Sequence, residues 1–192
     1  MATKHAKILD KTAINKTQAA MYSRSLTPHR DKLILALSNY AGARAGEIAA
    51  MEGRDVLDGE GRLRDEIFIS GRGAKYGSER NVPLHPELRS ELANYMMRLA
   101  DKEGPIFFGR YGDQLTPNAV VQILTRAYDR AGLKGCSSHS GRRTFITQLA
   151  RKAGKLACSI RDVQLLAGHA DLRTTQIYIE PSENAASLVA AP

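Results

Sequence analysis

Apolar residues recur at helical spacing along most of this chain. Two such segments begin at Thr27-Pro28 and Thr116-Pro117, where a capping residue precedes a proline at the first helical position. A third predicted helix runs from Pro86 to Lys102, before Gly104-Pro105. The apolar faces of the first two consist of Leu33, Ile34, Leu37 and Tyr40, and of Val120, Ile123, Leu124 and Ala127. Most of the core is therefore expected to be helical.

Between residues 56 and 84 the pattern changes to short apolar runs separated by turns. The predicted strands are Val56-Leu57, Ile67 to Ile69 and Arg80 to Leu84, and a glycine-rich hairpin tip spans Gly71 to Ser78. No helix follows the glycines of this tip, which excludes a nucleotide-binding loop. The sequence predicts an α+β fold that is mainly α, a helical domain with a small three-stranded antiparallel sheet near residues 56–84.

The two ends of the chain lack a regular apolar pattern. Residues 1–25 carry five lysine or arginine residues against the single acid Asp10, with at most a short helix between Thr12 and Tyr22. We interpret them as a basic arm or linker that either contacts phosphates or is solvated. Residues 26–180 are the expected folded domain. Residues 181–192 form a C-terminal tail with small apolar residues, either unstructured or docked on a partner.

Composition narrows the classes of function. The 192 residues carry a net charge of +8, and arginine outnumbers lysine, which fits phosphate binding. The absence of Trp argues against stacking of single-stranded bases, so double-stranded DNA is the expected partner. No apolar run is long enough to span a membrane, and a soluble, cytoplasmic protein is expected. Cys136 and Cys158 lie outside any zinc-binding spacing.

The stretch from Leu165 to Tyr178 carries the first candidate chemistry. Gly168 suits the left-handed position just beyond a helix end, and Asp171 suits the cap of a second short helix. The turn between these helices would allow His169 and Tyr178, nine residues apart, to share a site. Taken alone, the same residues also fit a polar cap and a half-buried packing residue.

Two more clusters carry arginine beside a possible partner. His139 and Arg142 lie three residues apart in the first turn of a predicted helix, where helix N–H groups favour a phosphate, with Ser137 or Ser138 as its cap. Arg44 lies at a glycine-rich break between two helices. Glu47, on the same face, could hold its guanidinium by an ion pair or form an ordinary surface pair.

Taken in order, these motifs resemble the tyrosine recombinase (phage integrase) family. The similarity covers about residues 27–180 and rests on Arg44 in G-x-R-x-x-E, Lys75 in the hairpin before Arg80-Asn81-Val82-Pro83-Leu84, His139 with Arg142, and His169 with Tyr178. It implies that residues 26–180 are the family's catalytic domain, preceded only by the basic arm and not by the helical core-binding domain of most members.

The resemblance also implies catalytic roles. Tyr178 is the nucleophile and forms a covalent 3′-phosphotyrosine. Arg44 and Arg142 neutralise the phosphorane through guanidinium groups with five donors each. His139 transfers the phenol proton, and His169 donates a hydrogen bond to a non-bridging oxygen.

Three further residues complete this expected site. By resemblance, Lys75 protonates the leaving 5′ oxygen. Glu47 supports Arg44. Arg143 stands in Gly141-Arg142-Arg143, where the family usually shows Leu-Arg-His, so the tuning around Arg142 is expected to differ.

The implied activity is site-specific recombination of duplex DNA, as in integrases, invertases or resolvases, without metal, cofactor or ATP. The protein would be bacterial or phage-encoded and associated with the nucleoid. It would be monomeric in solution and a homotetramer on synapsed DNA, with residues 181–192 docking on a neighbour. Two alternatives stay open: a nicking and closing enzyme of the type IB topoisomerase class, and a catalytically idle DNA-binding regulator of a full-length recombinase.

Overall fold

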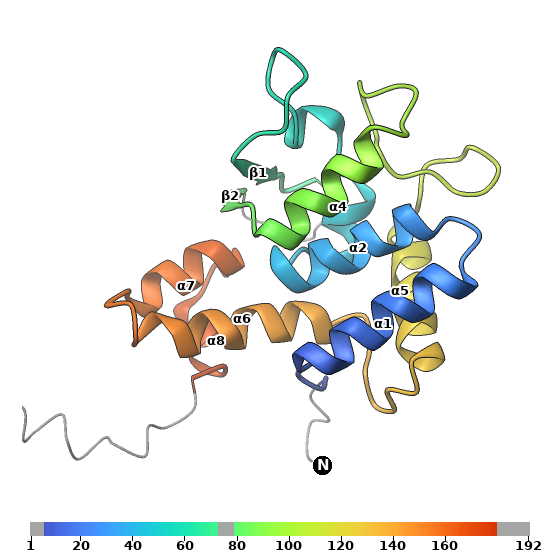
Figure 1. The fold of residues 1–192 in the computed structure, drawn as a ribbon. Coiled ribbons are helices and arrows are strands. Elements are labelled where there is room, and N and C mark those ends of the chain that lie inside the picture. Colours follow the sequence, from blue (N-terminus) through green and yellow to red (C-terminus); the bar gives the residue numbers. More distant parts are fainter. Residues whose placement is uncertain (1–5, 73–78, 180–192) are drawn as a thin grey trace, which may run out of the picture.

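In the computed structural model, described for residues 6–72 and 79–179, the chain forms eight α-helices, one 3-10 helix and two β-strands (Figure 1). In chain order they are α1 (Lys11–Arg24), α2 (Pro28–Tyr40), α3 (Ala45–Ala49), η1 (Gly53–Asp55), β1 (Glu66–Ile69), β2 (Arg80–Pro83), α4 (Pro86–Met96), α5 (Pro117–Arg130), α6 (Ser140–Ala153), α7 (Ile160–Ala167) and α8 (Leu172–Gln176). The predicted class, α+β and mainly α, is confirmed.

Helix α2 lies at the centre of the helical body. It packs against α1, α4, α5 and α6, and residues 33–37 are fully buried around its whole circumference. In Figure 1 it crosses the middle of the molecule, with α4 above it and α6 below. Gly141 allows α6 to approach closely, because a Cβ at this position would clash with the side chains of Ser38 and Asn39.

The Thr-Pro signals mark helix starts correctly, whereas one predicted helix end is wrong. Pro28 and Pro117 are the first residues of α2 and α5. Helix α4 begins at Pro86 as predicted but ends at Met96 instead of Lys102, because the chain beyond it continues in three-residue turns. Within residues 6–72 and 79–179, no helix has the length and apolar character needed to cross a membrane.

The sheet has two strands in the described residues, and the prediction of three is corrected. Strands β1 and β2 pair antiparallel with Ile67 opposite Val82 and Ile69 opposite Arg80, and these four residues face the helical body. The expected first strand at residues 56–57 follows η1 in a turn, because both of its N–H groups donate to the carbonyl of Gly53. An isolated bridge joins residues 57 and 63.

The N-terminal segment belongs to the helical body. The expected short helix is present as α1, which packs against α2 and α5. Leu9, Ile14 and Met21 are buried in the main core, and the Leu9 N–H donates to Thr144 Oγ1 of α6 at 2.7 Å. The interpretation of residues 1–25 as a free arm is therefore wrong from Leu9 onward.

Candidate active site

Two arginines bind consecutive carbonyl groups at the end of α7. Arg44 Nη2 donates to the carbonyl of Gly168 at 3.2 Å, and Arg142 Nη2 donates to that of Ala167 at 2.6 Å. The last carbonyls of a helix have no partner within the helix and carry partial negative charge, so they attract cations. Arg142 Nη1 also donates to the carbonyl of Gly42. These bonds join the α2–α3 loop, α6 and α7 at one place.

Arg44 is positioned by its own helix. It is the N-cap residue of α3, as the glycine-rich break predicted. Glu47 accepts hydrogen bonds from both the backbone N–H and the Nη1 of Arg44, each at 2.7 Å. The Arg44 side chain is 30% exposed, whereas that of Glu47 is fully buried. The expected ion pair is present, and its burial makes it more than a surface pair.

Glu47 also holds Arg80, a residue that the sequence analysis did not single out. Arg80 Nη1 donates to Glu47 Oε1 at 3.0 Å and its Nη2 donates to Oε2 at 2.9 Å. The signal was the strand alternation, which places Arg80 on the same inward face as Val82. A basic residue at a buried strand position requires a partner.

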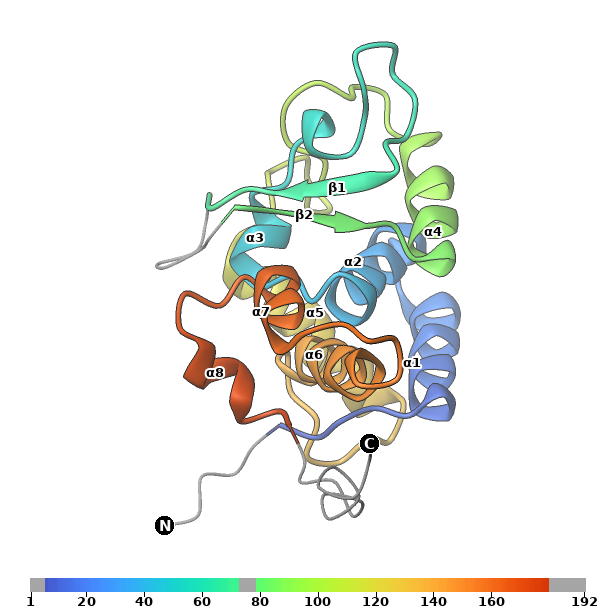
Figure 2. The same cartoon turned by 90° about the vertical axis from the view of Figure 1, so that its left-hand side faces the viewer.

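His169 and Tyr178 meet across the turn that the sequence predicted. Gly168 adopts the left-handed conformation with φ of 62°, and Asp171 caps α8 by accepting from the Arg173 N–H at 2.9 Å. The rings of His169 and Tyr178 stack with centroids 6.0 Å apart. His169 Nδ1 lies 2.9 Å from Thr175 Oγ1. Figure 2 shows α7 and α8 together beneath the β1–β2 hairpin.

His139 is the N-cap residue of α6, three residues before Arg142, and its side chain is exposed. The helix begins at Ser140, so the prediction that Ser137 or Ser138 caps it is wrong. The Ser140 hydroxyl instead accepts from the Ser137 N–H at 3.0 Å, which closes the turn before the helix. Arg142 is therefore in the first turn of α6, as expected.

Arg143 and Lys75 are the two remaining residues of the expected site. Arg143 is half-buried beside Arg142. Lys75 lies outside the described residues.

The cluster is strongly electropositive. Burial and the charges of Arg44 and Arg80 lower the pKa of Arg142 to about 9, which leaves it charged at neutral pH. Burial and the three arginines lower the pKa of His169 to about 4, so its imidazole is neutral. Burial alone would raise the pKa of Glu47, but hydrogen bonds and charge from Arg80 and Arg44 lower it to about 2. One carboxylate thus faces three guanidinium groups.

The chain matches a protein-family model over nearly its whole length. The family model described as "Phage integrase family" matches residues 7–185. The chain belongs to the phage integrase family. The match includes α1, in agreement with its packing in the core.

Curated phage integrase relatives are longer than this chain. Tyrosine recombinase XerA of Pyrococcus furiosus is 32% identical over 152 residues, which cover 78% of this chain and 49% of the relative. Tyrosine recombinase XerC of Methylobacterium sp. (strain 4-46) is 34% identical over 153 residues, which cover 78% and 45% respectively. The chain therefore spans about half the length of the curated relatives that it matches.

Solved structures share the fold of this phage integrase domain. A XerH site-specific recombinase bound to difH substrate in a pre-cleavage complex matches with a TM-score of 0.75 and 22% identity, covering 100% of this chain and 55% of that one. The Tn1549 transposon integrase in complex with transposon right end DNA matches with a TM-score of 0.78 and 16% identity, covering 99% and 68%.

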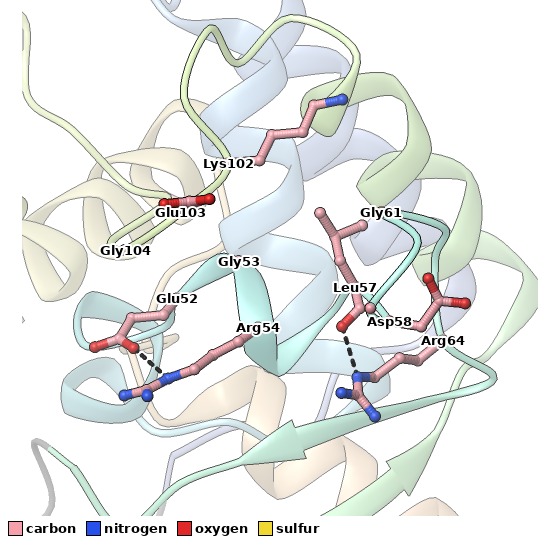
Figure 3. Close-up of a pocket in the computed structure, with 11 residues that line it drawn as sticks. Glu52, Gly53, Arg54, Leu57, Asp58, Gly61, Arg64, Lys102, Glu103 and Gly104 are labelled. Atoms are coloured by element: carbon pink, nitrogen blue, oxygen red, sulfur yellow. Dashed lines mark hydrogen bonds and ion pairs between the residues drawn. The ribbon is translucent and has the colours of Figure 1, made fainter.

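The described candidate residues of this phage integrase domain do not line the cavity beside η1. That cavity, of about 650 Å³, lies between η1, the turn at residues 58–61 and the loop at residues 102–104 (Figure 3). Figure 3 shows the Glu52–Arg54 ion pair and the bond from Arg64 to the carbonyl of Leu57 at its edge. Within the described residues, no group of three or more His, Cys, Asp or Glu side chains could hold a metal ion.

Proposed function

We propose that this chain is a DNA strand transferase of the tyrosine recombinase type, which cleaves and rejoins duplex DNA through a 3′-phosphotyrosine at Tyr178. One observation carries the proposal: the guanidinium groups of Arg44 and Arg142 donate hydrogen bonds to two consecutive carbonyl groups at the end of α7. These bonds place two guanidinium groups at the chain turn that leads into His169 and Tyr178. A binding module has no need of a phenol there.

The chemistry follows from these groups. The Oη of Tyr178 attacks the scissile phosphorus and forms a P–O bond, while the bond from phosphorus to the 5′ oxygen breaks. His139 takes the phenol proton, and Lys75 gives a proton to the leaving 5′ oxygen. Arg44 and Arg142 stabilise the extra negative charge of the phosphorane, where the loss of one donor typically costs about two to three decades in rate.

His169 is suited to donate a hydrogen bond to a phosphate oxygen. Its pKa of about 4 makes the imidazole neutral, so one ring nitrogen carries a proton and the other accepts one. If Nδ1 accepts from the Thr175 hydroxyl, 2.9 Å away, the proton lies on Nε2 and is available to the substrate. Thr175 is fully buried, so it can fix the ring as well as the tautomer.

The proposed substrate is duplex DNA, and the proposed biological reaction is site-specific recombination by a homotetramer on two synapsed duplexes. The net charge of +8 and the electropositive cluster support a polyanionic partner. Phage integrase relatives of this fold include a lambda integrase dimer bound to a COC′ core site. Residues 9–180, which include α1 because it packs in the core, are proposed as the catalytic unit and residues 181–192 as its docking tail. A nucleoid-associated location in a bacterial cell would fit.

A nicked suicide substrate tests the covalent step. The protein is incubated with a pool of duplexes of random sequence, each nicked so that the short strand beside the cleavage site diffuses away. We expect an adduct that is stable in denaturing gels and sensitive to protease. It should be lost in Tyr178→Phe and retained in Tyr111→Phe, because Tyr111 is a surface residue that is 86% exposed. An adduct that survives in Tyr178→Phe, or none in the wild-type protein, overturns the proposal.

The products then separate recombination from its nearest alternative. A recombinase yields four-way junctions and exchanged strands when two duplexes carry the DNA site recovered from the covalent adduct. A type IB topoisomerase-like enzyme relaxes supercoiled DNA without these junctions. A catalytically idle regulator binds duplex DNA and gives neither product.

A further inference from the structure

The Glu47 carboxylate connects the β-hairpin to the proposed catalytic arginine. Arg80 of β2 binds both carboxylate oxygens, and the same Glu47 accepts two hydrogen bonds from Arg44. The side chains of Glu47 and Arg80 are 0% and 4% exposed, so this junction is shielded from water. A buried carboxylate requires charged partners, and its orientation is set by all of them together.

The orientation of the Arg44 guanidinium depends on Glu47 more than that of the Arg142 guanidinium does. Its side chain is 30% exposed and, apart from Glu47, its guanidinium is bonded to the Gly168 carbonyl at 3.2 Å. Arg142, in contrast, is buried between two carbonyls from different segments. Because catalytic groups must be held within about 0.5 Å of the productive geometry, a small rotation of Glu47 would misplace Arg44.

We propose that Arg80 is a positioning residue for Arg44. Arg80 donates hydrogen bonds to both carboxylate oxygens of Glu47 and so fixes this carboxylate, which in turn orients the Arg44 guanidinium toward the scissile phosphate. Arg80 need not touch the DNA itself. The part of this inference that concerns phosphate chemistry rests on the function proposed above. The part that concerns the orientation of Arg44 does not.

A second ion pair of the same hairpin provides a matched control. Arg72, just beyond β1, donates from Nη2 to both carboxylate oxygens of Asp55 at 2.7 and 2.9 Å, and Asp55 is 2% exposed. This pair ties the hairpin to η1 without involving Glu47. If Arg80 only anchors the hairpin, Arg72→Met and Arg80→Met should have similar effects.

The kinetic test compares suicide cleavage of two substrates, one with a normal scissile phosphate and one with a methylphosphonate. The methylphosphonate is neutral, so cleavage depends less on a cation beside the non-bridging oxygens. We expect Arg80→Met to slow cleavage of the phosphate by about tenfold, less than the roughly 10²- to 10³-fold loss that is typical when an oxyanion donor is removed outright. The deficit should shrink on the methylphosphonate for Arg80→Met and Arg44→Ala, but not for Arg72→Met.

A double variant tests whether Arg80 acts through Arg44. The Arg44→Ala/Arg80→Met protein should cleave no more slowly than Arg44→Ala alone, because the group to be positioned is already absent. Additive losses, or a deficit in Arg80→Met that is unchanged on the methylphosphonate, would overturn the inference. If Arg80→Met does not fold, Arg80→Lys takes its place, because one ammonium cannot grip both oxygens in the same way. It should show a smaller deficit of the same kind.

NMR of arginine side chains gives a readout that needs no activity. With ¹⁵N-labelled arginine, the Arg44 guanidinium should show restricted rotation in the wild-type protein and in Arg72→Met, and averaged signals in Arg80→Met. Unchanged Arg44 signals in Arg80→Met would refute the positioning role. Absence of any wild-type adduct would instead refute the proposed function, while the NMR comparison would still decide the role of Arg80.

Discussion

Ala167 and Gly168 show how a few backbone atoms can organise a site. Their carbonyl groups, at the end of α7, accept from Arg142 and Arg44, and the left-handed Gly168 turns the chain directly into His169. The same turn thus receives two cations and presents the imidazole beside them. Bonds within the protein hold the two guanidinium groups, so they should reorganise little when a phosphate binds.

Protonation of His169 should make the stability of the protein dependent on pH. Its pKa is about 4 in the folded state, whereas 6.5 is the ordinary value expected after unfolding. The unfolded chain therefore binds a proton first, and the contribution of His169, complete above about pH 6.5, is lost as the pH falls toward 4. At 1.36 kcal/mol per unit, the loss amounts to about 3 kcal/mol.

Urea unfolding at pH 7, 5.5 and 4.5 measures this loss. His169→Gln is the control, because it has no imidazole to protonate while the carboxylates elsewhere are unchanged. We expect the free energy of unfolding to fall more steeply in the wild-type protein than in His169→Gln. Parallel curves would show that burial and the arginines do not keep His169 neutral.

Single residues were predictable from the sequence where their partners are close in the chain. The Arg44–Glu47 pair follows from helical spacing, and the turn between His169 and Tyr178 follows from Gly168. Arg80 was missed because its partner Glu47 is 33 residues away and on a different element. Local pattern alone does not reveal such a pair, since it is created by tertiary packing.

The difference between local signals and tertiary packing also explains which helices and strands were predicted correctly. Caps and prolines are local signals, and they locate the starts of α2, α4 and α5 correctly. The expected strand at residues 56–57 failed because its N–H groups bond to Gly53 in a turn. The burial of α1 was missed because its few apolar residues, Ile14 and Met21 among them, are separated by polar ones. Packing against α2 and α5, and not an amphipathic pattern, determines the place of α1.

Adjacent residues of α1 provide a test of this packing. Met21 is 2% exposed and belongs to the core, whereas Tyr22 is 64% exposed. Met21→Ala should lower the free energy of unfolding by about 2 to 5 kcal/mol, the usual cost of emptying a core methionine position. Tyr22→Ala should have a much smaller effect. Denaturant unfolding of both variants is the measurement, and equal, negligible losses would restore the interpretation of a free arm.

At the scale of the whole molecule, the positive charge is unevenly compensated. Arg62, in the turn after η1, pairs with Asp58 and Glu60 at the surface. Around the proposed active site, Glu47 pairs with both Arg44 and Arg80, and its charge also acts on Arg142. The net charge of +8 is therefore less informative than the local excess beside Tyr178.

The different pairing of Arg44 and Arg62 predicts which of the two contributes to DNA binding. Binding of duplex DNA should weaken steeply with salt, because phosphate contacts release counterions in proportion to their number. Arg44→Ala should reduce the slope of log Kobs against log salt concentration by about 1, as expected for one lost phosphate contact.

Arg62→Ala is the control. It removes the same formal charge, but from a guanidinium already paired with two carboxylates, so its slope should match that of the wild-type protein. Fluorescence anisotropy titrations at several salt concentrations measure the three slopes. Equal decreases in both variants would mean that net charge, and not the site around Tyr178, governs the encounter with DNA.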